Sequence, residues 1–164
     1  MRVFCFSLLL LFLNVGHSNT PKYKNSNWYL DLVETKQVLL YSPSTDERAF
    51  LRVVKQRGGW QVGLLVQAFL TPSHARTKTH FEAIRPNTFW GNKHTTLLFH
   101  HDYPSGLKFL GWSESDDLVL WIMEKELIKV NFKTMNGKEI SYTFNVSQLE
   151  GAMTEILRQQ AALR

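Results

Sequence analysis

The histidines are the first residues whose number suggests chemistry, because a neutral imidazole is the commonest side-chain ligand of transition metals in proteins. Six occur in 164 residues, and five of them lie beyond residue 18: His74, His80, His94, His100 and His101. Adjacent residues of a strand lie on opposite faces of a sheet, so the last two would not share an ion on a strand. No H-E-x-x-H motif is present. The sequence therefore predicts histidines that are exposed or hydrogen-bonded at strand ends, with no metal site and no cofactor.

Nucleophilic and acid–base chemistry is equally poorly supported by the sequence. The chain has no G-x-S-x-G elbow, and its one cysteine, Cys5, lies in the N-terminal apolar run. His101, Asp102 and Ser105 are near one another, but a trio of this kind arises by chance in most chains of this size. The acids between residues 114 and 117 suit the N-terminus of a helix. We expect a non-enzymatic protein, with a small secreted hydrolase or a hydrolase inhibitor as the alternative.

Two segments favour contact with a partner. Residues 71–80 have no apolar period and are interpreted as an exposed basic loop, in which Arg76 and Lys78 could meet an acidic surface. Phe89 and Trp90 stand in a turn-like stretch, and exposed aromatic side chains mark interaction sites more often than catalytic ones. These four residues are the candidate partner contacts. The net charge of +5 falls short of the basic stripe of a nucleic-acid binder, so no nucleic-acid partner is expected.

The first 18 residues have the order of a secretory signal peptide. Arg2 precedes an almost wholly apolar run over residues 4–13, and the small residues Gly16 and Ser18 follow it. The expected cleavage lies between Ser18 and Asn19. The apolar run is about half of the roughly 20 residues that span a bilayer, so no stable transmembrane segment is expected after processing, although an uncleaved anchor is the alternative. Cleavage also removes the cysteine, and export without disulfides favours a bacterial periplasm.

After this segment we expect a flexible lead over residues 19–27 and a single β-rich domain over residues 28–164. Short apolar runs alternate with turn residues at intervals of about ten, which is typical of an antiparallel β fold. Strands are expected at residues 28–33, 37–41, 49–55, 60–70, 81–84, 95–99 and 107–112.

The last third of the chain has the clearest pattern. A short helix is expected at 118–123, after its acidic N-terminal residues. Apolar residues then alternate with polar ones on either side of Asn136-Gly137, which predicts a β-hairpin. Ser147 and Glu150 have the spacing of a capping box that opens an amphipathic helix. The predicted fold is therefore mostly β, an antiparallel sandwich with a short helix and a C-terminal amphipathic helix packed on the terminal hairpin.

This order of elements resembles the bacterial exported β-sandwich proteins of the invasion-associated locus B type, and more broadly the accessory proteins of type VI secretion. The resemblance depends on the signal peptide with the strands that follow Trp28, and above all on the ending from residue 117 to residue 157. The chain differs from these families in having no cysteine in its strands. The resemblance implies a non-enzymatic envelope protein, an accessory or interaction module with a protein partner, linked to host interaction or to a secretion machine.

Overall fold

The protein is described from a computed structural model. The structure describes residues 22–32, 38–56, 59–67, 76–84, 93–98, 101–102, 107–112, 117–133 and 137–162. The expected signal peptide with its cleavage between Ser18 and Asn19, and the candidate contacts Phe89 and Trp90, lie outside the described residues.

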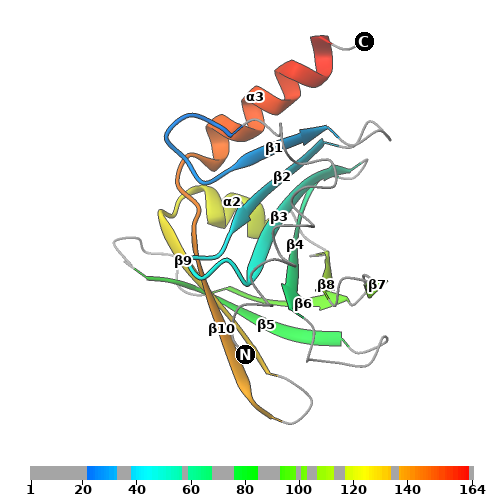
Figure 1. The fold of residues 1–164 in the computed structure, drawn as a ribbon, viewed down its shortest axis with the longest axis vertical. Helices are drawn as coiled ribbons and strands as arrows, with labels where there is room; N and C mark the ends of the chain where they lie inside the picture. Colours follow the sequence, from blue (N-terminus) through cyan, green and yellow to red (C-terminus); the bar gives the residue numbers. More distant parts are fainter. Residues whose placement is uncertain are drawn as a thin grey trace, which may run out of the picture.

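Two antiparallel sheets make up most of the described chain (Figure 1). The six-stranded sheet has the order β1-β2-β3-β4-β8-β7. Its strands are β1 (Tyr29–Leu32), β2 (Val38–Pro43), β3 (Ala49–Gln56), β4 (Gly59–Gln67), β8 (Leu107–Trp112) and β7 (His101–Asp102). The four-stranded sheet has the order β10-β9-β5-β6. Its strands are β10 (Glu139–Asn145), β9 (Leu127–Lys133), β5 (Arg76–Ala83) and β6 (Lys93–Leu98). The mostly-β antiparallel fold predicted from the sequence is confirmed.

The core lies between the two sheets. Along β10 buried side chains alternate with more exposed ones, whereas β2 is buried along nearly its whole length. Leu51, Val53 and Leu64 of the larger sheet are fully buried, and so are Phe81 and Val130 of the smaller one. All belong to one hydrophobic cluster. Burying a side chain of this size contributes about 1.5–3 kcal/mol, so the alternation is enough to hold the sheets face to face.

The terminal hairpin follows the predicted pattern. β9 and β10 pair so that Ile140 faces Phe132, Tyr142 faces Val130 and Phe144 faces Ile128. Gly137 has a φ of +75°, a left-handed conformation that glycine adopts without steric cost. The Asn-Gly signal therefore marked the position of the turn correctly.

The C-terminal helix α3 (Leu149–Ala162) does not have the expected position on that hairpin. It packs chiefly on β1, β2 and the short helix α2 (Asp117–Met123), at the end of the molecule seen uppermost in Figure 1. The apolar side of the hairpin is instead part of the core shared with the larger sheet. The apolar stripe of α3, which includes Ala152 and Ile156, therefore covers the end of that core.

The start of α3 also differs from the predicted capping box. The Ser147 hydroxyl donates to Oδ1 of Asn145 at 2.6 Å, and the Ser147 backbone N–H donates to the same atom at 3.1 Å. Gln148 has a φ of +65°, and its carbonyl accepts the N–H of Ala152. The Asn145 side chain thus stabilises the bend before α3. It hydrogen-bonds to the Ser147 hydroxyl, which in a capping box would bond to a backbone N–H in the first turn of the helix.

The expected basic loop at residues 71–80 is wrong from residue 76 onwards, where β5 begins. Arg76 pairs with Leu98 of β6, and Thr79 pairs with Phe132 of β9. Thr79 is only 2% exposed. Threonine counts as a polar residue, but its β-branched side chain favours strands and fits a half-buried face. The polar composition therefore predicted a loop at positions where a strand begins.

Among the described residues, no helix has both the length and the apolar character needed to cross a membrane.

A candidate binding surface at the edge of the larger sheet

Residues 22–27 form a hydrogen-bonded turn at the edge of the larger sheet, within the segment 19–27 that the sequence predicted as a flexible lead. The Tyr23 N–H donates to the Trp28 carbonyl at 2.8 Å, and Lys22 bridges to Tyr29. The Ser26 hydroxyl donates to the Tyr23 carbonyl at 3.0 Å and accepts the Trp28 N–H at 3.1 Å. Asn25 takes the left-handed conformation that asparagine tolerates, with a φ of 55°.

Two contacts attach this turn to the rest of the protein. Trp28 is fully buried, and its indole Nε1–H donates to the Val146 carbonyl at 3.3 Å. Tyr23 lies against Gly151 of α3, where a Cβ atom would come 2.9 Å from Cζ of the tyrosine. The turn is therefore positioned by the segment that leads into α3 as well as by β1.

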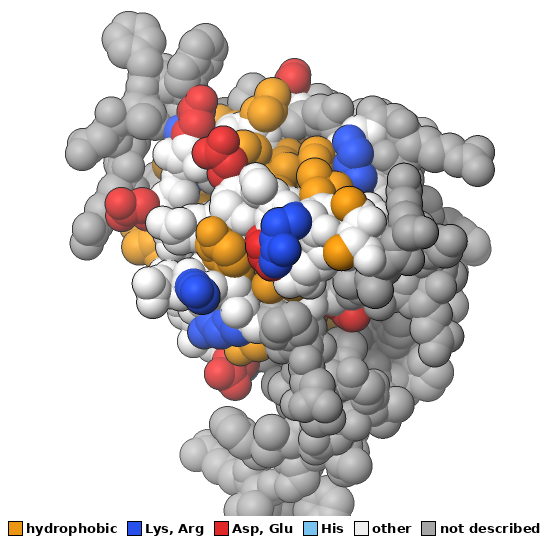
Figure 2. Space-filling view, turned by 90° about the horizontal axis from the view of Figure 1, so that it is seen from above, with side chains coloured by type: hydrophobic (Ala, Val, Ile, Leu, Met, Phe, Trp, Pro, Cys, Tyr) orange, Lys and Arg blue, Asp and Glu red, His pale blue; other side chains and the backbone are white. Residues whose placement is uncertain are grey.

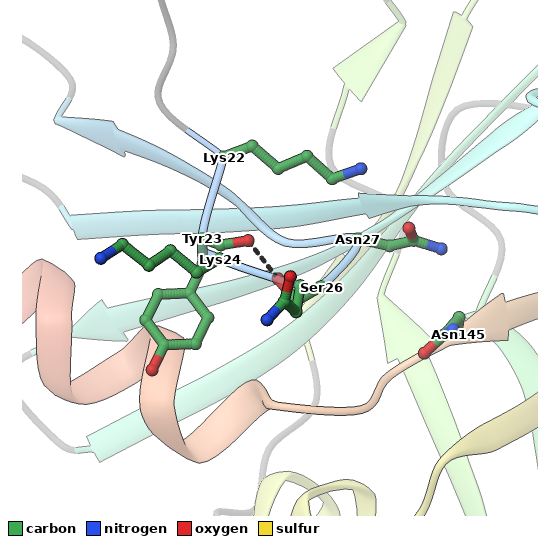
Figure 3. Close-up of a pocket in the computed structure, with 7 residues that line it drawn as sticks. Lys22, Tyr23, Lys24, Ser26, Asn27 and Asn145 are labelled. Carbon is green, nitrogen blue, oxygen red and sulfur yellow. Dashed lines mark hydrogen bonds between the residues drawn. The ribbon is translucent and has the colours of Figure 1, made fainter.

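A shallow polar pocket of about 430 Å³ opens between this turn and the end of β10 (Figure 3). Its lining consists of Lys22, Tyr23, Lys24, Asn25, Ser26, Asn27 and Asn145. These residues present two ammonium groups and three carboxamides, with no carboxylate among them. Groups of this kind hydrogen-bond to polar or anionic atoms of a ligand.

An aromatic row adjoins the pocket on the larger sheet. The rings of Tyr29 and Tyr41, which are cross-strand partners, stack with centroids 5.0 Å apart and planes 7° apart. Phe50 meets Tyr41 edge-on at 6.2 Å. Lys22 Nζ lies 5.6 Å from the centroid of the Tyr29 ring. We call Lys22, Tyr29, Tyr41 and Phe50 the tyrosine face.

The tyrosine face lies on the opposite side of its strands from Leu30 and Leu40; within it Tyr41 is only 6% exposed, and Tyr29 and Phe50 are half-buried. Leu30 and Leu40, which alternate with its tyrosines, belong to the main hydrophobic cluster, whereas Tyr41 is not a member of that cluster as the described residues define it. Arg52 is the cross-strand partner of Tyr41 on β3. Tyrosine and arginine are the residue types enriched at the centres of protein interfaces.

One carboxylate of α3, which the charge of Lys24 reaches, has several hydrogen-bond donors around it. On α3, Glu155 accepts hydrogen bonds from Arg158 at 2.9 and 2.7 Å and from Gln159 at 2.9 Å. The Arg158 bonds, followed by the Gln159 bond and with a smaller contribution from the charge of Lys24, lower the pKa of Glu155 to about 2. Figure 2, seen from the α3 end, shows charged side chains of both signs among small groups of hydrophobic ones.

The candidate contacts predicted from the sequence are not part of this surface as far as the structure describes them. Arg76 and Lys78 lie on β5 of the smaller sheet, and Phe89 and Trp90 lie outside the described residues. His101 and Asp102 form β7, at the opposite edge of the larger sheet from β1. Within the described part of the chain, no three or more His, Cys, Asp or Glu side chains cluster as a metal site would require.

Sequence reasoning missed the tyrosine face. Tyr29 and Tyr41 were visible only as strand residues in two separate apolar runs. Their stacking depends on the register of β1 against β2, which pairs Tyr29 with Tyr41. The alternation of Tyr29 with Leu30, and of Tyr41 with Leu40, was the available signal that both rings lie on the opposite side of the sheet from these leucines.

Comparison with known proteins gives a likeness of fold. No protein-family model matches the chain, and no curated protein matches it. Among solved structures, the crystal structure of invasion associated protein B from Bartonella henselae is similar, with a TM-score of 0.63 and 13% sequence identity. The match covers 88% of this chain and 99% of that chain. At this identity the likeness shows a shared fold, which agrees at that level with the resemblance read from the sequence.

Proposed function

We propose that this chain is an exported, non-enzymatic accessory module of a bacterial envelope, which binds a protein partner through the tyrosine face. The observation that carries this proposal is the stacked Tyr29–Tyr41 pair outside the main core, with Lys22 over it. A pair of stacked rings contributes about 0.5–1.5 kcal/mol beyond the area that it buries. Tyr41 is only 6% exposed, so Tyr29 is the accessible ring of the pair, and a ring held rigidly in this way loses little conformational entropy when a partner covers it.

The charges around the tyrosine face favour a partner with an acidic rim. Lys22 lies over the Tyr29 ring and is exposed, as is Lys24 of the same turn, and Arg52 is the cross-strand partner of Tyr41. Charges at the rim of an interface steer association and set specificity. The polar pocket next to Tyr29 would then receive hydrogen-bonding groups of the same partner.

The proposed address and pathway have separate support. Export rests on the signal-peptide pattern of residues 1–18 and on the cysteine-free chain that cleavage would leave. The likeness of fold to a protein named as invasion-associated supports a part in host interaction. The resemblance to accessory proteins of type VI secretion supports a secretion-linked role. Both pathways need a protein partner, so the binding surface is the point to test.

The experiment is a quantitative pull-down from the soluble envelope fraction of the source organism. Wild type is compared with Tyr29→Ala and Phe50→Ala, and with Leu120→Ala as the control, because Leu120 is 58% exposed on α2. We expect one stoichiometric partner that both variants of the tyrosine face lose and the control retains. A partner retained equally by all four proteins would overturn the proposed surface.

Mass spectrometry of the same samples tests the address. A mature chain that begins at Asn19 in the soluble fraction is expected from cleavage after Ser18. A chain that begins at Met1 and stays with the membranes would instead support the uncleaved anchor. The two measurements are independent. If the chain stays with the membranes, the effect of Tyr29→Ala on partner binding can still be measured in that fraction.

A further inference from the structure

The polar pocket at the end of β10 is lined mainly by groups that donate hydrogen bonds. Lys22 and Lys24 carry ammonium groups, and Asn25, Asn27 and Asn145 carry carboxamides. An ammonium group is a donor only, and a carboxamide has two donor hydrogens on its nitrogen. The lining thus combines two positive charges with neutral donors, which is the chemistry that binds an anion.

Two other side chains of the lining are used within the protein. The Ser26 hydroxyl donates to the Tyr23 carbonyl and accepts the Trp28 N–H. Tyr23 lies against Gly151, and Figure 3 shows its ring on the α3 side of the turn. These two side chains shape the pocket, and the lysines and asparagines are left to contact a ligand.

Asn145 is oriented by its own hydrogen bonds. Its Oδ1 accepts the Ser147 N–H at 3.1 Å and the Ser147 hydroxyl at 2.6 Å. The Nδ2 group is the other arm of the same carboxamide, so it is the donor that this side chain offers to the pocket. A donor whose orientation is already fixed loses less freedom on binding than a mobile one.

The two lysines differ in where their charge acts. In Figure 3 Lys22 extends on the same side of the turn as Asn27, and Asn145 lies on that side at the end of β10, whereas Lys24 extends the other way. The charge of Lys24 contributes slightly to the lowered pKa of Glu155 on α3. Lys22 is therefore the principal cation of the pocket, and Lys24 adds to the positive potential around it.

We propose that this pocket binds a phosphate monoester, with Lys22, Asn27 and Asn145 as its contacts. Such a group carries a charge of about −1.5 to −2 at pH 7 and three acceptor oxygens, which match the two lysines and the carboxamide donors. A carboxylate has a single charge and two oxygens, so it would leave part of the lining unused. The volume of about 430 Å³ lies in the range of small-molecule sites, so there is room for the alcohol part of the ester. The inference rests on the proposed function in one respect, because partner groups that enter the same pocket compete with the phosphate.

The first test is a titration of sodium phosphate into the purified full chain, with sodium chloride keeping the ionic strength constant. Nuclear magnetic resonance of the side-chain amides follows the binding. We expect saturable shifts of the Asn27 and Asn145 amides, and weaker binding of sodium acetate. Shifts that do not saturate, or equal affinity for acetate, would overturn the proposal.

Two variants locate the site. Lys22→Gln removes the principal charge, and Asn145→Asp keeps the Oδ1 acceptor for Ser147 while an anionic oxygen replaces the donor. Each should weaken phosphate binding by about tenfold or more, the usual contribution of a hydrogen bond to a charged group. Lys133→Gln, at an exposed position on β9, lowers the net charge by the same amount and should retain wild-type affinity. Affinity that survives Lys22→Gln, or that Lys133→Gln lowers equally, would contradict the assigned site.

Two further ligands distinguish the source of the phosphate. Glycerol 3-phosphate is a soluble monoester, and vesicles of phosphatidylcholine with phosphatidic acid present the same group as a lipid headgroup. Binding of glycerol 3-phosphate without sedimentation on the vesicles assigns a soluble ligand. Sedimentation that requires both phosphatidic acid and Lys22 assigns a headgroup. Binding of neither overturns the proposal.

The titrations need no protein partner, so their result is independent of whether the tyrosine face binds one. Competition is measured in the pull-down from the soluble envelope fraction. Glycerol 3-phosphate should release the partner at an ionic strength at which sodium chloride does not. A partner retained at saturating glycerol 3-phosphate would refute the competition.

Discussion

Tyr23 lies so close to Gly151 that a side chain at position 151 would displace it, since a Cβ atom there would meet Cζ of the tyrosine at 2.9 Å. Gly151 lies in the first turns of α3. Glycine inside a helix is normally less stable than alanine by about 0.5–1 kcal/mol. At this position the close approach of Tyr23 opposes that preference.

This relationship predicts that the effect of Gly151→Ala changes sign with the residue at position 23. In wild type the substitution destabilises the protein, because Tyr23 must leave its place and the turn over residues 22–27 loses an attachment. In a Tyr23→Ala background it stabilises by about 0.5–1 kcal/mol, the ordinary gain of alanine over glycine in a helix. Urea denaturation of the four proteins of this double-mutant cycle measures the coupling. Equal effects in the two backgrounds would show that the two residues do not interact.

The sequence predicted those parts of the fold that depend on local pattern. The alternation of Ile128, Val130 and Phe132 around the Asn136-Gly137 step was enough to predict the hairpin, because period-two burial and a turn signal are both local. The amphipathic stripe of α3 likewise predicted a helix with one buried face. It did not say which surface that face would cover, because the hairpin and the end of the larger sheet are both apolar.

The candidate sites were harder to predict, because they depend on register. Tyr29 meets Tyr41 only through the pairing of β1 with β2. The turn over residues 22–27 is polar in composition and is ordered through distant contacts, such as the bond from Trp28 to the Val146 carbonyl. No window of sequence around Lys22 contains that information.

Phe144 tests the buried side of the hairpin. It is fully buried, pairs with Ile128 and forms an isolated bridge to Ser44, which directly follows β2. Phe144→Asp removes a large apolar side chain and places an unpaired charge in the core, a loss well above the usual limit of about 4–5 kcal/mol for single substitutions. We expect no cooperative unfolding transition by circular dichroism. Leu120→Asp, at a side chain 58% exposed on α2, is the control and should fold. A Phe144→Asp protein that melts like wild type would refute the buried assignment.

Trp28 tests the link between β1 and the segment before α3. Trp28→Phe retains an aromatic ring in the core but removes the Nε1–H donor to the Val146 carbonyl. The buried carbonyl loses its partner and the smaller ring leaves space, so we expect a loss of about 1–3 kcal/mol in the free energy of unfolding. Guanidinium denaturation followed by far-ultraviolet circular dichroism measures it. Trp60→Phe, at a partly buried ring packed against the same core, is the comparison and should cost less.

Glu155 provides a prediction on pH. Its pKa in the folded protein is about 2 against an ordinary 4.5, chiefly because Arg158 and then Gln159 donate hydrogen bonds to its carboxylate. A folded-state pKa below the unfolded one stabilises the protein above the unfolded pKa, and this stabilisation is lost as the pH falls from about 4.5 to about 2. Arg158→Gln should therefore raise the pKa of Glu155 markedly toward its ordinary value, whereas Lys24→Gln should raise it only slightly. Titration of the Glu155 carboxyl carbon by nuclear magnetic resonance measures all three proteins. A larger effect of Lys24→Gln than of Arg158→Gln would mean that the turn over residues 22–27, and not the neighbouring turn of α3, controls this carboxylate.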